Sequence, residues 1–217
     1  MSSIFRKSSL FLTLVVCSFH IQAQEVITAF AVEYKVEGSN AAVNKEDGDF
    51  MSYSFTGASM SMILINKMVD LKMVYNDAEG VGLLLNSMQM GSVKVAVKLT
   101  AQDLEYEKEQ LRIEPISGTK RIAGYLCQGA IIHAKDKSIE VWYSTKLKPH
   151  DFYFEGYYFS ELEGFPLLII ETNKAGILTS KATKVVVKNL PDNLFDTTIP
   201  EGYKLTTFEV MNGGGKK

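Results

Sequence analysis

The sequence predicts a mainly β protein of the α+β class, built on one large antiparallel sheet. Apolar and polar residues alternate with a period of two along many segments, turn-forming residues separate these segments, and helical patterns are few. A sheet of roughly ten strands twists strongly and tends to curl. We therefore expect a curved antiparallel sheet that forms a half-open barrel, with two or three short helices on its concave face.

The expected strands follow one another along most of the chain. In the first, Phe30 and Val32 point to one face and Glu33 to the other, the pattern of a strand with one buried and one solvated face. Pairs such as Ser117-Gly118 are typical of the turns between strands. The expected strands span residues 26–36, 50–56, 59–66, 68–75, 81–86, 92–99, 111–116, 120–134, 139–143, 166–173, 176–188 and 203–210.

Three short helical segments are expected between or after these strands. A capping pattern at 100–103 opens a helix to about Glu109. Pro149 suits the first turn of a second helix, which Gly164 can end. A last helical turn is expected over residues 192–195. Where helices fill the concave side of a curved sheet imperfectly, an apolar cleft remains between sheet and helices.

The second expected helix is rich in aromatic residues. Six aromatic residues occupy the eight positions from Phe152 to Phe159, which is more than one buried helix face requires. One interpretation is a lid, whose inner side covers a ligand while its outer side meets a partner or a membrane surface. The other interpretation is a helix buried on two sides.

The first 24 residues are typical of a secretory signal peptide. Arg6 and Lys7 precede an apolar run over residues 10–16, and the small residue Ala23 lies near the end. This run is far shorter than the roughly 20 residues that span a bilayer. We expect export to the periplasm. The alternative is an outer-membrane lipoprotein anchored through Cys17, because the residues before it loosely resemble a lipoprotein cleavage box.

After the signal peptide of residues 1–24 we expect a single domain over 25–211 and a disordered tail over 212–217. No later stretch has the length of a transmembrane segment. The formal net charge of −2 excludes a strongly basic surface over the whole chain, and nucleic acid is therefore not an expected partner. If the leader is removed, Cys127 is the remaining cysteine and cannot close an internal disulfide.

Motifs of known catalytic or cofactor sites are missing from the sequence. It contains no nucleophile elbow, P-loop, HExxH or CxxC pattern. Cys127 is interpreted either as a reactive thiol or as a small buried side chain, and its place within an expected strand favours the second. His133 and His150 could assist a catalytic or zinc site, but each is isolated and is better explained as structural or solvated. We expect no enzyme activity, no cofactor and no metal site.

Methionines concentrate between residues 51 and 90. Three interpretations stay open: plain core packing, the lining of an adaptable apolar pocket, and Cu(I) binding by soft thioethers. In the second interpretation the aromatic helix covers the methionines. The candidate ligand-binding residues are then Met60, Met62, Met88, Met90, Phe152 and Phe159.

Several stretches resemble a family of exported bacterial proteins. They are Gly118-Thr119-Lys120-Arg121-Ile122-Ala123-Gly124-Tyr125-Leu126-Cys127, Ile139-Glu140-Val141-Trp142-Tyr143, Gly164-Phe165-Pro166-Leu167, Leu194-Phe195 and Ile199-Pro200-Glu201-Gly202-Tyr203. The chain resembles periplasmic lipoprotein carriers of the LolA and LolB type, in particular their relatives catalogued as a domain of unknown function (DUF 4412-type). The resemblance implies a half-open barrel with helices as a lid, which in the carriers proper holds acyl chains.

The function expected from these observations is an exported, non-enzymatic binding module. It would hold a hydrophobic ligand, an acyl chain or a lipoprotein lipid, between the sheet and the helices. Each buried methylene contributes about 0.8 kcal/mol, so such a site needs no charged anchor and leaves no motif. The alternative is a structural or protein-interaction component of the cell envelope that takes no small ligand and binds another envelope protein. A third hypothesis, an enzyme that uses Cys127 or His133, requires the thiol to be exposed beside a base.

Overall fold

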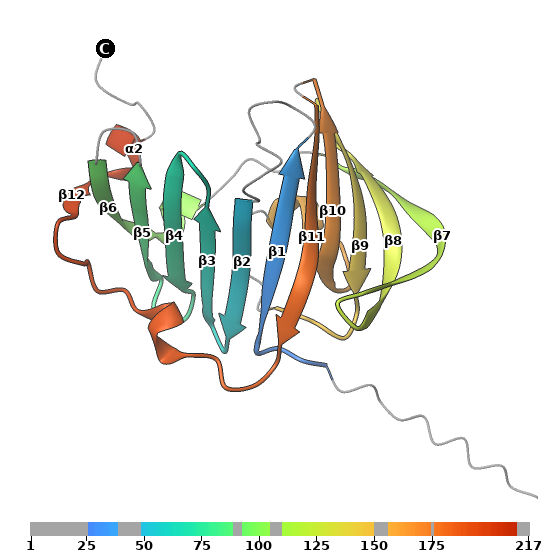
Figure 1. Ribbon diagram of the computed structural model, residues 1–217, viewed down its shortest axis with the longest axis horizontal. Helices are drawn as coiled ribbons and strands as arrows, with labels where there is room; N and C mark the ends of the chain where they lie inside the picture. The colour runs from blue at the N-terminus through green and yellow to red at the C-terminus, as the bar shows by residue number, and fades with distance from the viewer. Residues whose placement is uncertain are drawn as a thin grey trace, which may run out of the picture.

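The computed structural model describes residues 26–38, 49–88, 93–104, 110–149, 156–174 and 176–211. Twelve strands form one sheet, in the order β12-β6-β5-β4-β3-β2-β1-β11-β10-β9-β8-β7 (Figure 1). The strands are β1 (Phe30–Gly38), β2 (Asp49–Thr56), β3 (Ser59–Ile65), β4 (Val69–Asn76), β5 (Val81–Met88), β6 (Val93–Thr100), β7 (Arg112–Ile122), β8 (Tyr125–His133), β9 (Ser138–Ser144), β10 (Phe165–Asn173), β11 (Gly176–Val186) and β12 (Lys204–Thr206).

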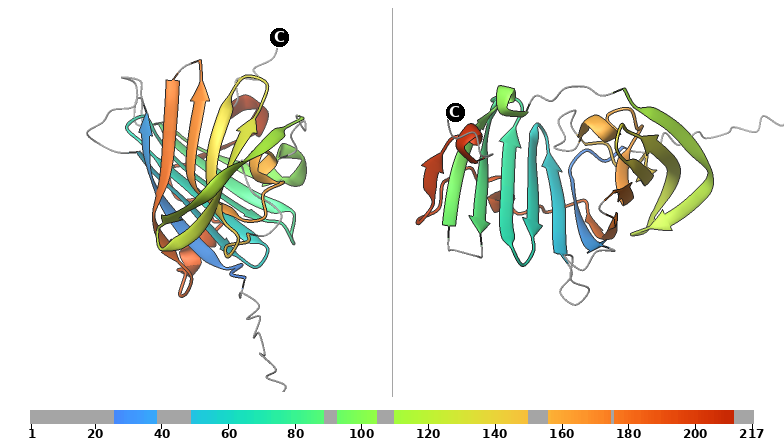
Figure 2. Two further views of the ribbon diagram at one scale, coloured as in Figure 1. Left: turned by 90° about the vertical axis from the view of Figure 1, so that its right-hand side faces the viewer. Right: turned by 90° about the horizontal axis from the view of Figure 1, so that it is seen from above.

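The chain builds one half of the sheet outward from the central strand β1 and the other half inward from the edge strand β7. Strands β1 to β6 pair antiparallel with their sequence neighbours, and so do β7 to β11. The two series join where β1 pairs antiparallel with β11. Strand β12 then adds to β6 in parallel. Seen from above, β11 to β7 curl away from the flatter half formed by β1 to β6 (Figure 2).

The expected half-open barrel with two or three helices on its concave face is wrong. The described chain is nearly all strand, and its sheet is open because the strand order ends in β12 on one side and β7 on the other. Two properties of these edges explain why the sheet does not close. Strand β12 is only three residues long, and β7 contains Pro115, which lacks a backbone N–H for further pairing.

The helices in the described residues are single turns of four residues each. They are the 3₁₀ turns η1 (Ala101–Leu104) and η2 (Asp192–Phe195) and the α-helical turns α1 (Gly156–Phe159) and α2 (Phe208–Met211). The second expected helix is thus reduced to α1 within these residues: Pro149 is not helical, and residues 150–155 lie outside them. Gly, Tyr and Phe have low helix propensity, so little opposes the turn ending where the chain must enter β10.

The alternation of buried and exposed residues is confirmed. In β1, Phe30, Val32 and Tyr34 are buried while Lys35 is exposed. We call the face that carries the main hydrophobic core the inner face. In Figure 1, α1 and η1 lie behind the sheet, on this side, and Phe159 and Leu104 pack into the core.

The opposite, outer face is covered in part by the C-terminal segment. Residues 187–203 lead from β11 past β3 and β4 to β12 (Figure 1). Ile199 and Tyr203 pack against a small second core made of Leu83, Leu85 and Ala96. The Lys72 Nζ donates a hydrogen bond of 3.0 Å to the carbonyl of Asn193 in η2.

Aromatic rings fill the inner face where the two halves of the sheet meet. Phe30, Phe55 and Phe165 contact one another with ring centroids 5.1 to 5.3 Å apart. Tyr53 stacks on Phe55, and the Tyr34 hydroxyl donates a hydrogen bond to the carbonyl of Pro166. Because these side chains are fully buried, this central part of the inner face is packed core.

Candidate functional site

The strand register arranges the inner face of β3 to β6 in four rows. The rows are Met60–Tyr75–Gly82–Leu99, Met62–Met73–Leu84–Val97, Leu64–Leu71–Asn86–Val95 and Val69–Met88–Val93. The last row lies at the upper ends of these strands in Figure 1. Apolar side chains dominate all four rows, which contain every second residue of each strand because successive residues point to opposite faces.

Exposure increases along these rows toward the upper end of the strands. The first two rows are buried, and Met62 and Met73 lie directly opposite each other. Met88 is 45% exposed and Val93 47% in the last row. Six half-buried or exposed apolar residues surround Asn86 there, and we call them the upper patch: Leu64, Val69, Leu71, Met88, Val93 and Val95.

The structure places four of the six predicted ligand-binding residues in the described part. Met60, Met62 and Met88 share the inner face, with Met60 and Met62 buried and Met88 at the exposed end. Phe159 of α1 is buried in the same core. Met90 and Phe152 lie outside the described residues, and Met73, opposite Met62, completes the methionine row.

Asn86 was not recognised from the sequence as a site residue. It lies on β5 between Leu71 and Val95, and its side chain is on the inner face. Asn86 is 9% exposed, and its Oδ1 is buried with no hydrogen-bond partner in the described part of the chain. The sequence of β5 contained no signal for it, because Leu83, Leu84 and Leu85 are apolar on both faces; the pairing with Leu71 and Val95 assigns Asn86 to the inner face.

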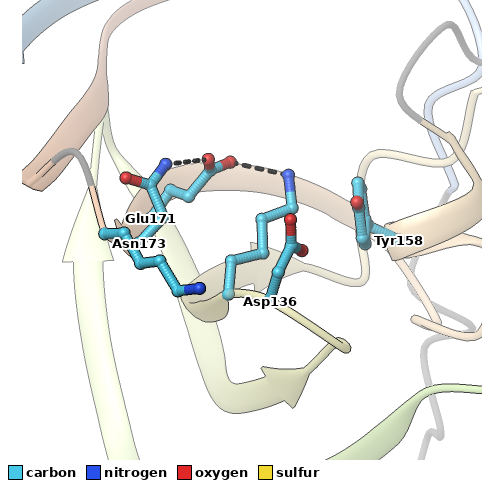
Figure 3. A pocket seen from close by; sticks show the side chains of 6 residues that line it. Asp136, Tyr158, Glu171 and Asn173 are labelled. Atoms are coloured by element: carbon cyan, nitrogen blue, oxygen red, sulfur yellow. Dashed lines mark hydrogen bonds and ion pairs between the residues drawn. The ribbon is translucent and has the colours of Figure 1, made fainter.

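A separate polar pocket of about 370 Å³ lies in the other half of the sheet (Figure 3). Lys137, in the connection between β8 and β9, has its Nζ 2.9 Å from Oε2 of Glu171 on β10. The same Nζ lies 4.0 Å from the centroid of the Tyr158 ring on α1. Asn173 donates a hydrogen bond of 3.1 Å to the other Glu171 oxygen, and Asp136 and Lys174 complete the lining.

This pocket acts as a clamp between α1 and the sheet. Both Glu171 oxygens already accept hydrogen bonds, and the Lys137 ammonium is held between a carboxylate and an aromatic ring. A cation over a ring is attracted by the ring quadrupole. The contacts tie Tyr158 to the β8–β9 connection and to β10.

The structure places Cys127 and His133 apart from either site. Cys127 is fully buried, and burial raises the pKa of its thiol to about 11. His133 pairs with Glu114 at 3.2 Å across β7 and β8. His150 lies outside the described residues. Among the residues that the structure describes, no group of His, Cys, Asp and Glu side chains is arranged to hold a metal ion.

The described part of the chain contains no helix with the length and apolar character needed to cross a membrane.

Comparison with known proteins gives a likeness of fold and no family. No family model matches the sequence, and no curated protein matches it. A solved structure of PNGF-II is similar with a TM-score of 0.51 and 15% identity, over 86% of this chain and 32% of that one. A second PNGF-II structure has a TM-score of 0.49 and 17% identity, over 85% of this chain and 31% of that one.

A β-barrel-like protein of domain of unknown function DUF1849 from Brucella abortus has a TM-score of 0.40 and 9% identity. That match covers 77% of this chain and all of the other. The chain therefore spans about a third of PNGF-II, with which it shares the fold of that part. No family match supports the resemblance to LolA-type and LolB-type carriers, which stays a prediction.

Proposed function

We propose that this protein is an exported, non-enzymatic binding module that holds an acyl chain or a lipid against the upper patch. One observation carries the proposal. The inner face of β3 to β6 passes from buried methionines to a half-exposed apolar surface around Asn86. An apolar chain placed on that surface would extend the core outward. The filled aromatic junction directs the ligand to the upper patch and away from the middle of the sheet.

The energetics set the size of ligand that fits the proposal. Burying one methylene contributes about 0.8 kcal/mol, so a chain of about twelve methylenes contributes roughly 10 kcal/mol. Association costs about 4 to 15 kcal/mol in lost freedom of motion. A long acyl chain is thus needed, whereas a short organic acid would gain too little. Met88, with its flexible thioether side chain, suits contact with such a chain.

The state of Cys127 supports the non-enzymatic part of the proposal. A thiol whose pKa is about 11 is protonated at neutral pH, and nucleophilic catalysis needs the thiolate. The side chain is also sealed inside the core. Export rests on the signal peptide that the sequence predicts, and removal of residues 1–24 is checked by the mass of the protein isolated from its own envelope.

The test compares two variants of one strand. Met88→Glu places a charge in the upper patch, and Val81→Glu places the same charge at the other end of β5, where Val81 is 46% exposed against 45% for Met88. Delipidated protein is titrated with a pyrene-labelled fatty-acid methyl ester. We expect at least tenfold weaker binding for Met88→Glu and unchanged binding for Val81→Glu. No uptake by the wild type, or equal losses in both variants, would overturn the proposal.

A second candidate function is an envelope interaction protein without a small ligand. The observation that favours it is the exposed turn between β3 and β4, where Met68 is 66% exposed beside Ile65 at 46%. Native mass spectrometry of the protein from its own envelope separates the two. A bound lipid mass supports the binding module. A protein partner that is lost in Met68→Asp, with no lipid mass, supports the interaction protein.

A further inference from the structure

Asn86 is the polar residue that the packing of the upper patch leaves unexplained. Its Oδ1 is buried, and among the described residues no donor lies within hydrogen-bond distance of it. Its neighbours in the row, Leu71 and Val95, are apolar and offer no side-chain donor. Buried polar atoms in folded proteins almost always have a partner, so this oxygen marks the place of a missing one.

Folding alone would favour a different residue at this position. A leucine at 86 would continue the apolar row formed by Leu64, Leu71 and Val95, and it would leave no unsatisfied amide. A partner that the described part of the chain does not supply would explain the amide. Met88, two residues along the same strand face, is exposed, so that something can approach Asn86 from the solvent side.

We propose that Asn86 selects the ligand, and that the ligand is an apolar chain carrying a neutral hydroxyl or amide N–H group. This inference rests on the proposed function. A hydroxyl or amide N–H donates to Oδ1 and satisfies it. An ionised carboxylate has no donor and would lose its hydration in the patch, and a plain hydrocarbon would leave Oδ1 unsatisfied.

The register also gives the depth of this contact. A strand rises about 3.3 Å per residue, so Asn86 lies about 7 Å below Met88 along the inner face. The donor group of the ligand is thus placed within the patch. Along the strands, the site ends at the next row down, where Met62 and Met73 are buried.

The experiment measures a preference between matched ligands. A pyrene-labelled fatty-acid methyl ester, which has no donor, is displaced by a long-chain primary alcohol, a primary amide or a methyl ether of the same chain length. We expect the wild type to bind the alcohol and the amide at least tenfold more tightly than the ether. In Asn86→Leu and Asn86→Ala this preference should vanish while the ether binds as before. Ser87→Ala, on the outer face of the same strand, is the control and should keep the preference.

The outcomes separate this inference from the proposed function. If the wild type takes up no pyrene probe, the proposed function fails and the inference fails with it. If the probe binds but the alcohol, amide and ether compete equally, or if Asn86→Leu keeps the preference, the inference alone is overturned.

A readout without ligand tests the same idea. Asn86→Leu should make the ligand-free protein at least as resistant to urea as the wild type, because it removes an unsatisfied buried amide. A clear loss of resistance would mean that Asn86 already has a partner within the folded chain, which would overturn the inference.

Discussion

Gly164 is the position where one added methyl group should cost the most stability. A Cβ at this position would lie 2.2 Å from the Ser144 carbonyl oxygen, 2.6 Å from its carbon and 2.8 Å from the Thr145 Cα. All three are main-chain atoms, so no side-chain rotation relieves the contact. Ordinary contacts of a Cβ begin near 3.4 Å, and the connection into β10 must therefore move away from the end of β9 by about 1 Å.

The expected magnitude follows from this geometry. Overpacking in a well-packed protein typically costs about 1 to 3 kcal/mol and occasionally more. Because the obstruction is main chain, we expect Gly164→Ala to lower the free energy of unfolding by about 3 kcal/mol, roughly a hundredfold change in the folding equilibrium. With a urea dependence of about 2 kcal/mol per molar, the unfolding midpoint falls by about 1.5 M.

Gly129→Ala is the matched control for this measurement. Its Cβ would lie 3.0 Å from the Cβ of Ile116 and from two ring carbons of Trp142, and side chains can move by a few tenths of an ångström. We expect a change within about 1 kcal/mol, partly offset because alanine restricts the unfolded chain. Urea unfolding is followed by the fluorescence of Trp142, the single tryptophan, and by circular dichroism. The reasoning is refuted if Gly164→Ala is as stable as Gly129→Ala.

Three further predictions concern the core. Because burial raises the pKa of Cys127, the folded state still holds the thiol proton at pH values where the unfolded state has lost it, and the free energy of unfolding falls as pH rises from 9.0 to about 11. In urea unfolding measured across this range, Cys127→Ala should make the fall with pH less steep. The same slope in Cys127→Ala and the wild type would contradict this prediction. Met73→Ala should cost about 2 to 5 kcal/mol and Met88→Ala less than about 1 kcal/mol in the same assay, whereas equal losses would contradict the gradient of burial along the rows. Tyr34→Phe should cost about 1 to 3 kcal/mol, since the buried carbonyl of Pro166 loses its donor; a thermal unfolding midpoint equal to that of the wild type argues against that bond.

The strands were largely predictable because their signal is local. The expected strand over 59–66 is β3 (Ser59–Ile65), and the expected strand over 81–86 is the first part of β5 (Val81–Met88). Alternation with a period of two needs no knowledge of the partner strand. It also assigns alternate residues of one strand to one face, as for Met60 and Met62 of β3.

Turns were harder to place, because a pair of residues that contains glycine can form either a turn or an irregularity within a strand. Ser117-Gly118 was expected to end a strand, but β7 continues through it with a shift of register between Ile116 and Thr119. The chain turns instead at Ala123-Gly124, with positive φ angles of 46° and 88°. Which of the two positions forms the turn depends on the pairing of β7 with β8, and a local sequence pattern does not indicate this pairing.

The helices failed for a related reason. Proline, glycine and a run of aromatic residues mark where a helix can begin and end, but they do not say how much of it forms. Phe159 and Tyr158 are held by the core and by the Lys137 clamp, so tertiary contacts fix this turn more than helix propensity does. Sequence patterns therefore could not predict how much helix covers the inner face of the sheet.

The candidate site shows where sequence reasoning on this chain loses its discriminating power. Met62 and Met88 look alike in sequence, yet one is packed core and the other is exposed, since burial depends on how far the covering segments reach along the strand. Asn86 follows three consecutive leucines that are apolar on both faces of β5, so its pairing with Leu71 and Val95 is needed to assign it to the inner face. What the amide indicates depends on its burial. In an exposed row water would hydrate it, whereas within the upper patch its buried oxygen lacks a hydrogen-bond partner among the described residues. Strand pairing locates such a residue on a face, and the packing around its amide oxygen is what links the residue to a ligand.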